Sequence, residues 1–178
     1  MTTHIGDRTL NLPLLCVVAV FLVIAGCVLP GGGHYYAPSA AGGKVVRNAC
    51  GGNIGAPDVL EFTKNDYKLF LSAYKSKKEA IVVLWVQPPP PSHDVSIPLS
   101  LNGAGIIAEK SDSGQRLQIM GVKQISSHGG IWIQISIRPV VPAFSLFIPT
   151  IQAGTIMFPA QTAHFHWSFG TWPEVINC

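Results

Sequence analysis

Hydrophobic positions that alternate with polar or larger ones recur along most of the chain and predict β-strands. The clearest case is residues 131–138, in which isoleucine occupies every second position. Successive side chains of a strand point to opposite faces of its sheet, so this period of two places the isoleucines together on a buried face. Residues 95–101 repeat the pattern and end at Asn102-Gly103. That dipeptide favours a two-residue hairpin turn into a partner strand over residues 104–110.

The same pattern predicts further strands as far as residue 169. The run 81–86 lacks polar alternation, which predicts that both of its faces are covered. Residues 59–63 fit either a short helix or a strand, and the turn-forming Lys64-Asn65-Asp66 that follows favours the strand. The other predicted strands are residues 67–74, 80–86, 117–119, 143–148, 155–158 and 162–169.

About eight to ten short strands separated by turns predict an all-β fold, either an antiparallel β-sandwich or a small barrel. The composition agrees, because 18 Gly and 14 Pro in 178 residues disfavour long helices. Hydrophobic residues make up 48% of the chain and charged residues 12%, which excludes a disordered protein. The formal net charge of +3 is too small to indicate a nucleic-acid partner, and none is expected.

The amino-terminal segment has a different pattern. Residues 12–29 contain no charged side chain, and Arg8 precedes them. A run of this kind is typical of an export signal, either cleaved or retained as a membrane anchor. Each of these alternatives places the remainder of the chain outside the cytoplasm.

The hydrophobic run ends in Ile24-Ala25-Gly26-Cys27, a quartet that resembles the lipobox of bacterial lipoproteins. The resemblance covers this end of the chain alone. It implies cleavage before Cys27, a diacylglycerol on the Cys27 thiol and attachment to the membrane through that lipid. Val28 stands where those proteins have Asp when they stay at the inner membrane. In a Gram-negative cell this implies the outer membrane, with the body facing the periplasm or the cell surface.

Three parts are therefore expected: a lipoprotein signal peptide over residues 1–26, a flexible Gly- and Pro-rich tether over 27–43, and a single sandwich domain over 44–178. Two cysteines lie in the predicted domain, Cys50 and Cys178. An even number in an oxidising compartment predicts a disulfide between them, with two free thiols as the alternative.

The metal-ligand candidates are His164 and His166 on a predicted strand. Residues two apart on a strand share a face and lie about 6.5–7 Å apart, so both imidazoles can reach one zinc or copper ion. The alternative is an ordinary polar face turned to water. A third ligand would have to come from a separate loop, and the candidates are His93, Asp94 and His128.

Aromatic residues gather near the carboxyl terminus. Strand alternation places Trp167 and Phe169 on the core face, whereas Trp172 falls outside that alternation and is expected to be exposed. An exposed indole stacks well on sugar rings or on a partner protein, so Trp172 is a candidate ligand-binding residue.

Three lysines, Lys75, Lys77 and Lys78, lie between two predicted strands. They form either a solvated turn or a contact with an anionic lipid or cell-wall polymer. No Gly-x-Ser-x-Gly elbow is present, and no residue is assigned a catalytic role.

The function expected from the sequence is that of a lipid-anchored envelope protein that acts as a structural or binding module, with an envelope protein or a polysaccharide as its partner. Two alternatives stay open. One is a surface metal-binding protein that uses the His-x-His pair. The other is a hydrolase of polysaccharide, which would require two carboxylates roughly 5–10 Å apart in one cleft.

Overall fold

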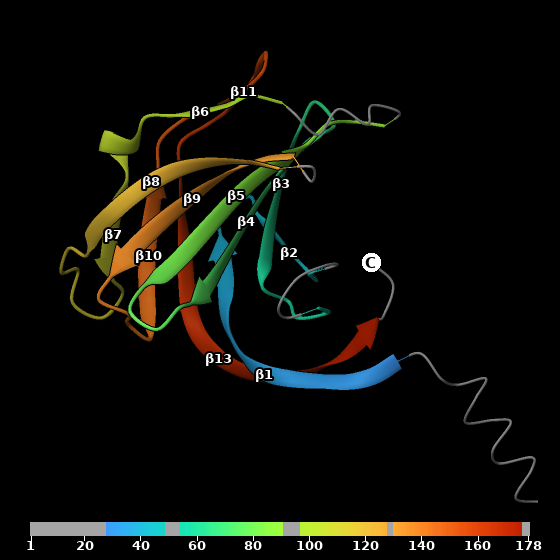
Figure 1. The fold of residues 1–178 in the computed structure, drawn as a ribbon, viewed down its shortest axis with the longest axis vertical. Helices are drawn as coiled ribbons and strands as arrows, with labels where there is room; N and C mark the ends of the chain where they lie inside the picture. Colours follow the sequence, from blue (N-terminus) through green and yellow to red (C-terminus); the bar gives the residue numbers. More distant parts are fainter. Residues whose placement is uncertain (1–27, 49–53, 91–96, 128–129, 176–178) are drawn as a thin grey trace, which may run out of the picture.

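The computed structural model describes residues 28–48, 54–90, 97–127 and 130–175, which fold almost entirely into β-strands (Figure 1). The strands form antiparallel sheets of six, four and three strands. The sheets do not close into a barrel. The predicted all-β sandwich is therefore confirmed, and the alternative of a closed barrel is wrong.

The largest sheet contains five of the predicted strands, namely those at residues 59–63, 67–74, 80–86, 117–119 and 131–138. The alternating isoleucines form one of them, with Ile133, Ile135 and Ile137 at 3%, 0% and 0% exposure. The strand predicted at 59–63 is confirmed over the helix alternative. In spatial order, the sheet consists of β2 (Lys44–Val46), β3 (Val59–Lys64), β4 (Tyr67–Lys75), β5 (Ala80–Gln87), β9 (Gly130–Arg138) and β8 (Gln118–Ser127).

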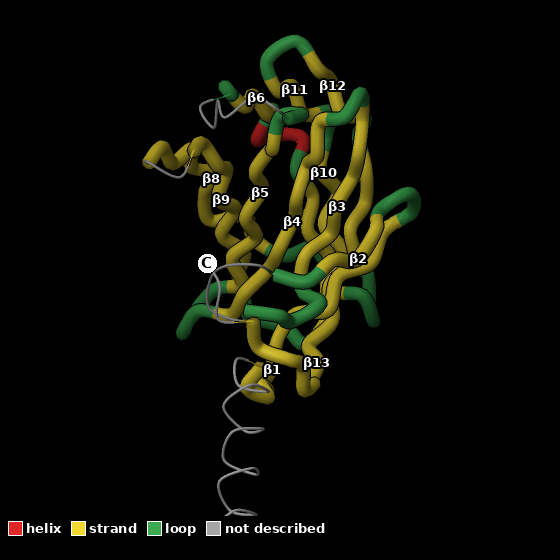
Figure 2. Tube along the Cα trace, turned by 90° about the vertical axis from the view of Figure 1, so that its right-hand side faces the viewer, coloured by secondary structure: helices red, strands yellow, loops and turns green. Residues whose placement is uncertain are grey.

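The second sheet packs against the first, and the third lies at one end of the molecule, far from the lower ends of β1 and β13 (Figures 1 and 2). The second sheet has the order β1 (Val28–Ala40), β13 (Gln161–Val175), β10 (Ala143–Ile148) and β7 (Ile107–Lys110). The third consists of β12 (Ile156–Phe158), β11 (Ile151–Ala153) and β6 (Leu99–Leu101).

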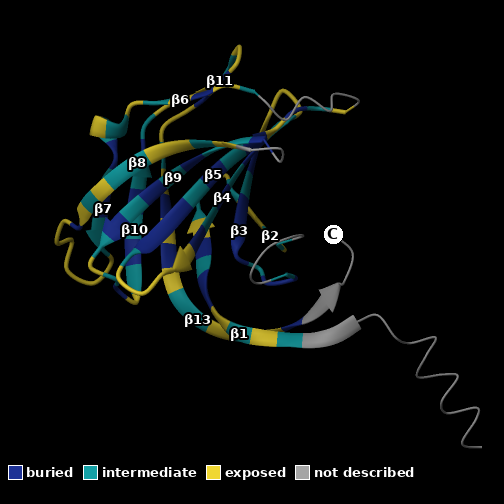
Figure 3. Ribbon diagram, viewed as in Figure 1, coloured by how far each residue is buried: buried dark blue, intermediate teal, exposed yellow. Residues whose placement is uncertain are grey.

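The core lies between the two larger sheets, where β5, β9 and β10 turn their buried positions inward (Figure 3). Tyr36 and Phe144 are both 0% exposed, and their rings meet edge to face at 5.3 Å. The Tyr36 hydroxyl donates a hydrogen bond of 2.8 Å to the Val141 carbonyl oxygen, which satisfies its polar end. Burial raises the pKa of the Tyr36 phenol.

The hydrogen-bonded hairpin predicted at Asn102-Gly103 is wrong. Asn102 has a φ of −73° and caps a short 3-10 helix, η1 (Gly103–Gly105), because its side chain accepts a hydrogen bond of 3.2 Å from the Ala104 N–H. The flanking strands pair elsewhere, β6 with β11 and β7 with β10. A local side-chain bond to the backbone has replaced the hairpin turn.

The run 81–86 was expected to be covered on both faces, and the second face is covered only in part, since Ile81 is 9% exposed there and Val83 is half-buried. Its alternate residues Val82, Leu84 and Val86 face the core, whereas Trp85 lies half-buried on the opposite face of the sheet. There Trp85 stacks on Phe70 of β4 with 5.1 Å between ring centroids. A cross-strand aromatic pair supplies part of the cover that a second layer would have given.

The flexible tether predicted over residues 27–43 is wrong for residues 28–40, which form β1 and pair with β13 along their whole length. β1 is an edge strand, and an edge strand tolerates proline because one side of its backbone needs no partner. Tyr36 and Pro38 of this strand are buried. Glycine and proline made the composition resemble a linker, and only pairing with β13 makes a strand of it.

The last residues of β13 and the first of β1 extend beyond the sandwich. β10 pairs with β13 no further than His166, so beyond that point β13 pairs with β1 alone. We name residues 28–35 and 168–175 the arm. The arm curves across the lower end of the molecule in Figure 1.

The turn between β3 and β4 has the conformation that its residues suggest. Asn65 and Asp66 have φ angles of 48° and 63°, and Lys64 pairs with Tyr67 across the turn. Both central residues are therefore left-handed, as a type I′ hairpin turn requires.

We expect Asp66→Gly to raise the free energy of unfolding by about 0.5–1 kcal/mol, because glycine has no Cβ to strain at a positive φ. The measurement is the midpoint of urea-induced unfolding. Asp66→Ala is the control, since it keeps a Cβ, and it is expected to lower the midpoint. A midpoint that Asp66→Gly leaves unchanged or lowers would contradict the strain argument.

Candidate binding pocket between strand β4 and the arm

A pocket arises where two neighbouring strands have unequal lengths. β3 begins at Val59, opposite Ser72 of β4, whereas β4 continues to Lys75 and stays paired with β5. Among the described residues, the β3 side of β4 beyond Ser72 thus has no strand partner, and β1 crosses beside it. A pocket of about 450 Å³ lies there. Besides Ser72, its lining includes His34, Asn48, Asp58, Tyr74, Lys75 and Trp167.

Trp167 of β13 is the aromatic centre of the pocket. The His34 ring lies nearly parallel to the indole, with 5.6 Å between centroids and 5° between planes. The Lys75 ammonium nitrogen lies 5.2 Å from the centroid of the indole, within reach of a cation–π interaction. Tyr36 meets the indole edge on from the core side at 4.9 Å. Two other strands, β1 and β4, therefore hold this ring in place.

The polar lining comes from the loop between β2 and β3. The Asn48 N–H donates a hydrogen bond of 2.8 Å to the Ala56 carbonyl, and the Gly55 N–H donates one of 2.7 Å to the Asn48 carbonyl. These bonds join Asn48 to residues 55 and 56, and Asp58, which follows them, is 5% exposed. The pocket thus combines a carboxylate, an amide, a hydroxyl, an imidazole and an ammonium with one indole.

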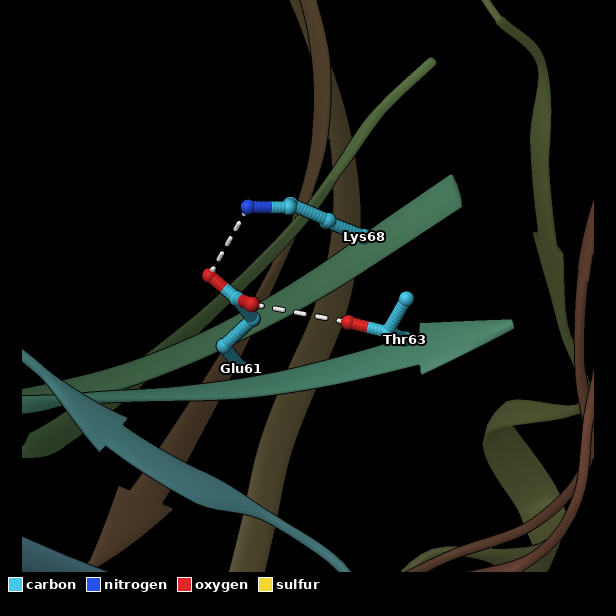
Figure 4. Close-up of polar contacts among 3 residues, drawn as sticks. All are labelled: Glu61, Thr63 and Lys68. Atoms are coloured by element: carbon cyan, nitrogen blue, oxygen red, sulfur yellow. Dashed lines mark hydrogen bonds and ion pairs between the residues drawn. The ribbon is translucent and has the colours of Figure 1, made fainter. Parts of the chain in front are cut away.

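Within the described residues, neither of two hollows is lined by the carboxylate pair that the hydrolase alternative requires, and that alternative stays a prediction. Of the described residues that line this pocket, Asp58 is the one carboxylate, and in a second hollow near Pro142 the one carboxylate is Asp112. Glu61 is engaged elsewhere, because its two oxygens lie 3.4 Å from Lys68 Nζ and 3.4 Å from Thr63 Oγ1 (Figure 4). This ion pair is partly buried at the surface of the sheet, and a surface pair of this kind contributes roughly 0–1 kcal/mol.

The predicted histidine pair lies as its alternation implies. His164 and His166 are both exposed and on one face of β13, and the Nδ1 of His164 is 2.8 Å from the Ser145 hydroxyl. The part of the chain that the structure describes contains no cluster of three or more potential metal ligands. The zinc or copper site stays a prediction that rests on two imidazoles.

The structure reverses the predicted exposure of two aromatic residues. Trp172, predicted to be exposed and ligand-binding, is 7% exposed, and Phe169, predicted to face the core, is 65% exposed. The reason is that β13 has left the sandwich at this point. Here its opposite face is covered, since Trp172 meets Tyr35 edge to face at 5.6 Å and packs with Ala56. Trp172 is therefore a packing residue of the arm.

No helix within the described residues is long and apolar enough to cross a membrane.

Several candidate residues fall outside the described part of the chain. The predicted lipid site, the predicted disulfide and the three candidate third ligands lie outside the described residues, namely Cys27, Cys50, Cys178, His93, Asp94 and His128.

Sequence patterns do not reveal the pocket, because the residues that line it are scattered along the chain. His34 falls in the predicted tether, Asp58 directly precedes the segment 59–63, Lys75 falls in a predicted turn and Trp167 on a predicted core face. No spacing links these positions, and the crossing of β1 over the end of β4 brings them together.

The fold and this site define a β-sandwich protein with a polar and aromatic binding pocket beside a two-stranded arm. No family model, curated protein or solved structure matches the chain. The functional conclusion therefore rests on the residues themselves.

Proposed function

We propose that this chain is an exported protein held on a membrane by lipid at Cys27, and that its sandwich is a binding module for a small polar molecule. The lipobox-like quartet that ends at Cys27 supports the anchor. Two or three acyl chains hold a protein on a bilayer durably, and a single chain does not.

The predicted disulfide belongs to the same proposal. An oxidising compartment outside the cytoplasm favours a bond between Cys50 and Cys178, the two cysteines that remain after lipidation and cleavage. In the chain-entropy model a bond across a loop of this length contributes roughly 4–5 kcal/mol.

The pocket beside Trp167 is the observation that carries the binding function. Its volume of about 450 Å³ lies within the roughly 300–1,000 Å³ that small-molecule sites occupy. Its indole offers an apolar surface, the Lys75 ammonium offers donors, and the lining also contains the Asp58 carboxylate and the Asn48 amide. Such a lining suits a small molecule that has hydroxyl or amine groups and one apolar face, such as a saccharide unit of an envelope polymer.

The test is native mass spectrometry of the full chain extracted from its own membrane in mild detergent. We expect a small molecule to remain bound to the unaltered protein and to be lost from Ser72→Phe, whose ring would fill the pocket. Ser136→Phe is the matched control. Ser136 is also a half-buried serine on the outward face of the six-stranded sheet, and it does not line the pocket.

Retention of the molecule by Ser136→Phe together with its loss from Ser72→Phe would support the pocket as the binding site. A protein that carries no small molecule, or equal retention by both variants, would overturn the proposed binding site. Neither result bears on the proposed lipid anchor, which the Cys27→Ala variant tests separately.

A further inference from the structure

One face at the arm end of the molecule combines exposed aromatic rings with lysines. We name it the basal face and define it by His34, Tyr74, Lys75, Lys77, Lys78 and Phe169. Phe169 is 65% exposed and Tyr74 is 45% exposed, and both are among the large hydrophobic residues that the fold leaves in solvent.

Ring contacts join the arm to the end of β4 across this face. His34 meets Phe169 edge to face at 5.2 Å and stacks on Trp167 at 5.6 Å, and Lys75 lies 5.2 Å from Trp167. Lys77 and Lys78 follow Lys75 in the exposed turn between β4 and β5. The lysines and Phe169 therefore belong to one surface.

The charge of this surface is positive. Glu79 adjoins the lysine turn, but its carboxylate lies 2.6 Å from the Arg138 guanidinium, which neutralises it. Asp58, the carboxylate that lines the neighbouring pocket, is 5% exposed and does not reach the surface. Three lysines beside an exposed phenylalanine match a bilayer interface, where cations meet headgroup phosphates and an aromatic ring enters the boundary region.

The position of the proposed anchor brings this face close to a membrane. Val28 pairs with Val175 at the end of the arm, and His34 pairs with Phe169 six residues further along β1. At about 3.4 Å per residue, Phe169 lies roughly 20 Å along the arm from Val28, the residue that follows the proposed lipid site in the sequence. The arm runs crosswise beneath the sandwich in Figure 1, and β1 and β13 lie at the same end in Figure 2. An arm that lies along the bilayer would set the basal face against it.

We infer that the basal face docks on the anionic phospholipid headgroups of the membrane to which Cys27 holds the protein. The inference rests on the proposed lipid attachment and adds an orientation to it. The lysines lie over the headgroup phosphates, Phe169 enters the interface, and the pocket beside Trp167 opens next to the bilayer surface.

The experiment uses the acylated full chain in vesicles of phosphatidylcholine alone or of phosphatidylcholine with phosphatidylglycerol. A brief pulse of an amine-acetylating reagent, followed by mass spectrometry, measures the reactivity of each lysine. Lys44, Lys64 and Lys123 are internal controls, because they are exposed on other strands.

With phosphatidylglycerol present, we expect Lys75, Lys77 and Lys78 to react about threefold or more slowly than in phosphatidylcholine alone, while the control lysines do not change. Sodium chloride at 1 M, where the Debye length is about 3 Å, should abolish the difference. Phe169→Ser should reduce the protection of the three lysines, since it removes the side chain that enters the interface.

Two outcomes would overturn the inference, and they differ in whether the proposed lipid anchor is also overturned. An acylated protein that floats with both kinds of vesicle, with equal reactivity of the three lysines in both, would overturn the docking of the basal face and leave the anchor intact. A chain that carries no acyl group and does not float would overturn both.

Discussion

Cys27→Ala is expected to abolish the incorporation of radiolabelled palmitate and to leave the protein as an unprocessed precursor. The reason is chemical, because alanine has no thiol to accept the diacylglycerol on which cleavage of a lipoprotein signal depends. The loss is large, since each buried methylene of an acyl chain contributes about 0.8 kcal/mol to membrane attachment. The measurements are palmitate labelling, the mass of the chain on a gel and its distribution between membrane fractions.

Cys16→Ala and Cys50→Ala are the controls for this experiment, because they remove thiols on either side of Cys27 along the chain. Both variants should incorporate palmitate as the unaltered protein does. Undiminished labelling of Cys27→Ala would remove the anchor, and the membrane docking of the basal face would fall with it. The sandwich fold does not depend on that result.

Phe144→Ala is expected to lower the free energy of unfolding by about 3–5 kcal/mol, the usual cost of removing a buried aromatic ring and leaving a cavity. Phe144 is 0% exposed, stacks on Phe165 at 5.0 Å and meets Tyr36 at 5.3 Å. Urea-induced unfolding measures the effect. Phe169→Ala is the control, because its side chain is 65% exposed and its loss should change stability by about 0.5 kcal/mol or less. Equal losses from the two variants would contradict the burial pattern.

Tyr36→Phe separates ring packing from hydrogen bonding in the same cluster. It keeps the ring and removes the bond to the Val141 carbonyl, at a cost of about 0.5–1.5 kcal/mol. Burial also raises the pKa of the Tyr36 phenol above its ordinary value of 10.0, so the unfolded chain releases this proton first. The contribution of Tyr36 to stability is complete below pH 10 and is lost as the pH rises toward the folded-state pKa. Tyr36→Phe should remove that part of the alkaline loss of stability.

The strands that the sequence predicted correctly are those whose pattern is set by the chain itself. The period of two in β9 places Ile133, Ile135 and Ile137 on one face whatever strand lies beside it. The turn at Asn65-Asp66 depends on the backbone freedom of two adjacent residues. By contrast, the hairpin at Asn102 was wrong, because a bond between its side chain and the Ala104 N–H outweighed the turn preference of the dipeptide.

The pocket could not be predicted, because it is made where elements distant in the chain meet. Lys75 approaches Trp167 only because β4 extends further than β3 and because β1, which pairs with β13, crosses beside the end of β4. A linear sequence records neither the length of one strand relative to its neighbour nor the place where two sheets cross.

By itself, the sequence determined the all-β class, the positions of most strands and the faces of those that lie within the sandwich, since these follow from side-chain alternation over a few residues. The tertiary structure decided the rest. It made a strand of the Gly- and Pro-rich segment 28–40 by pairing it with β13. It also buried Trp172 and exposed Phe169, because the layer that covers β13 changes sides where the arm leaves the sandwich. Alternation states which residues share a face, and only the packing of distant segments determines which face is covered.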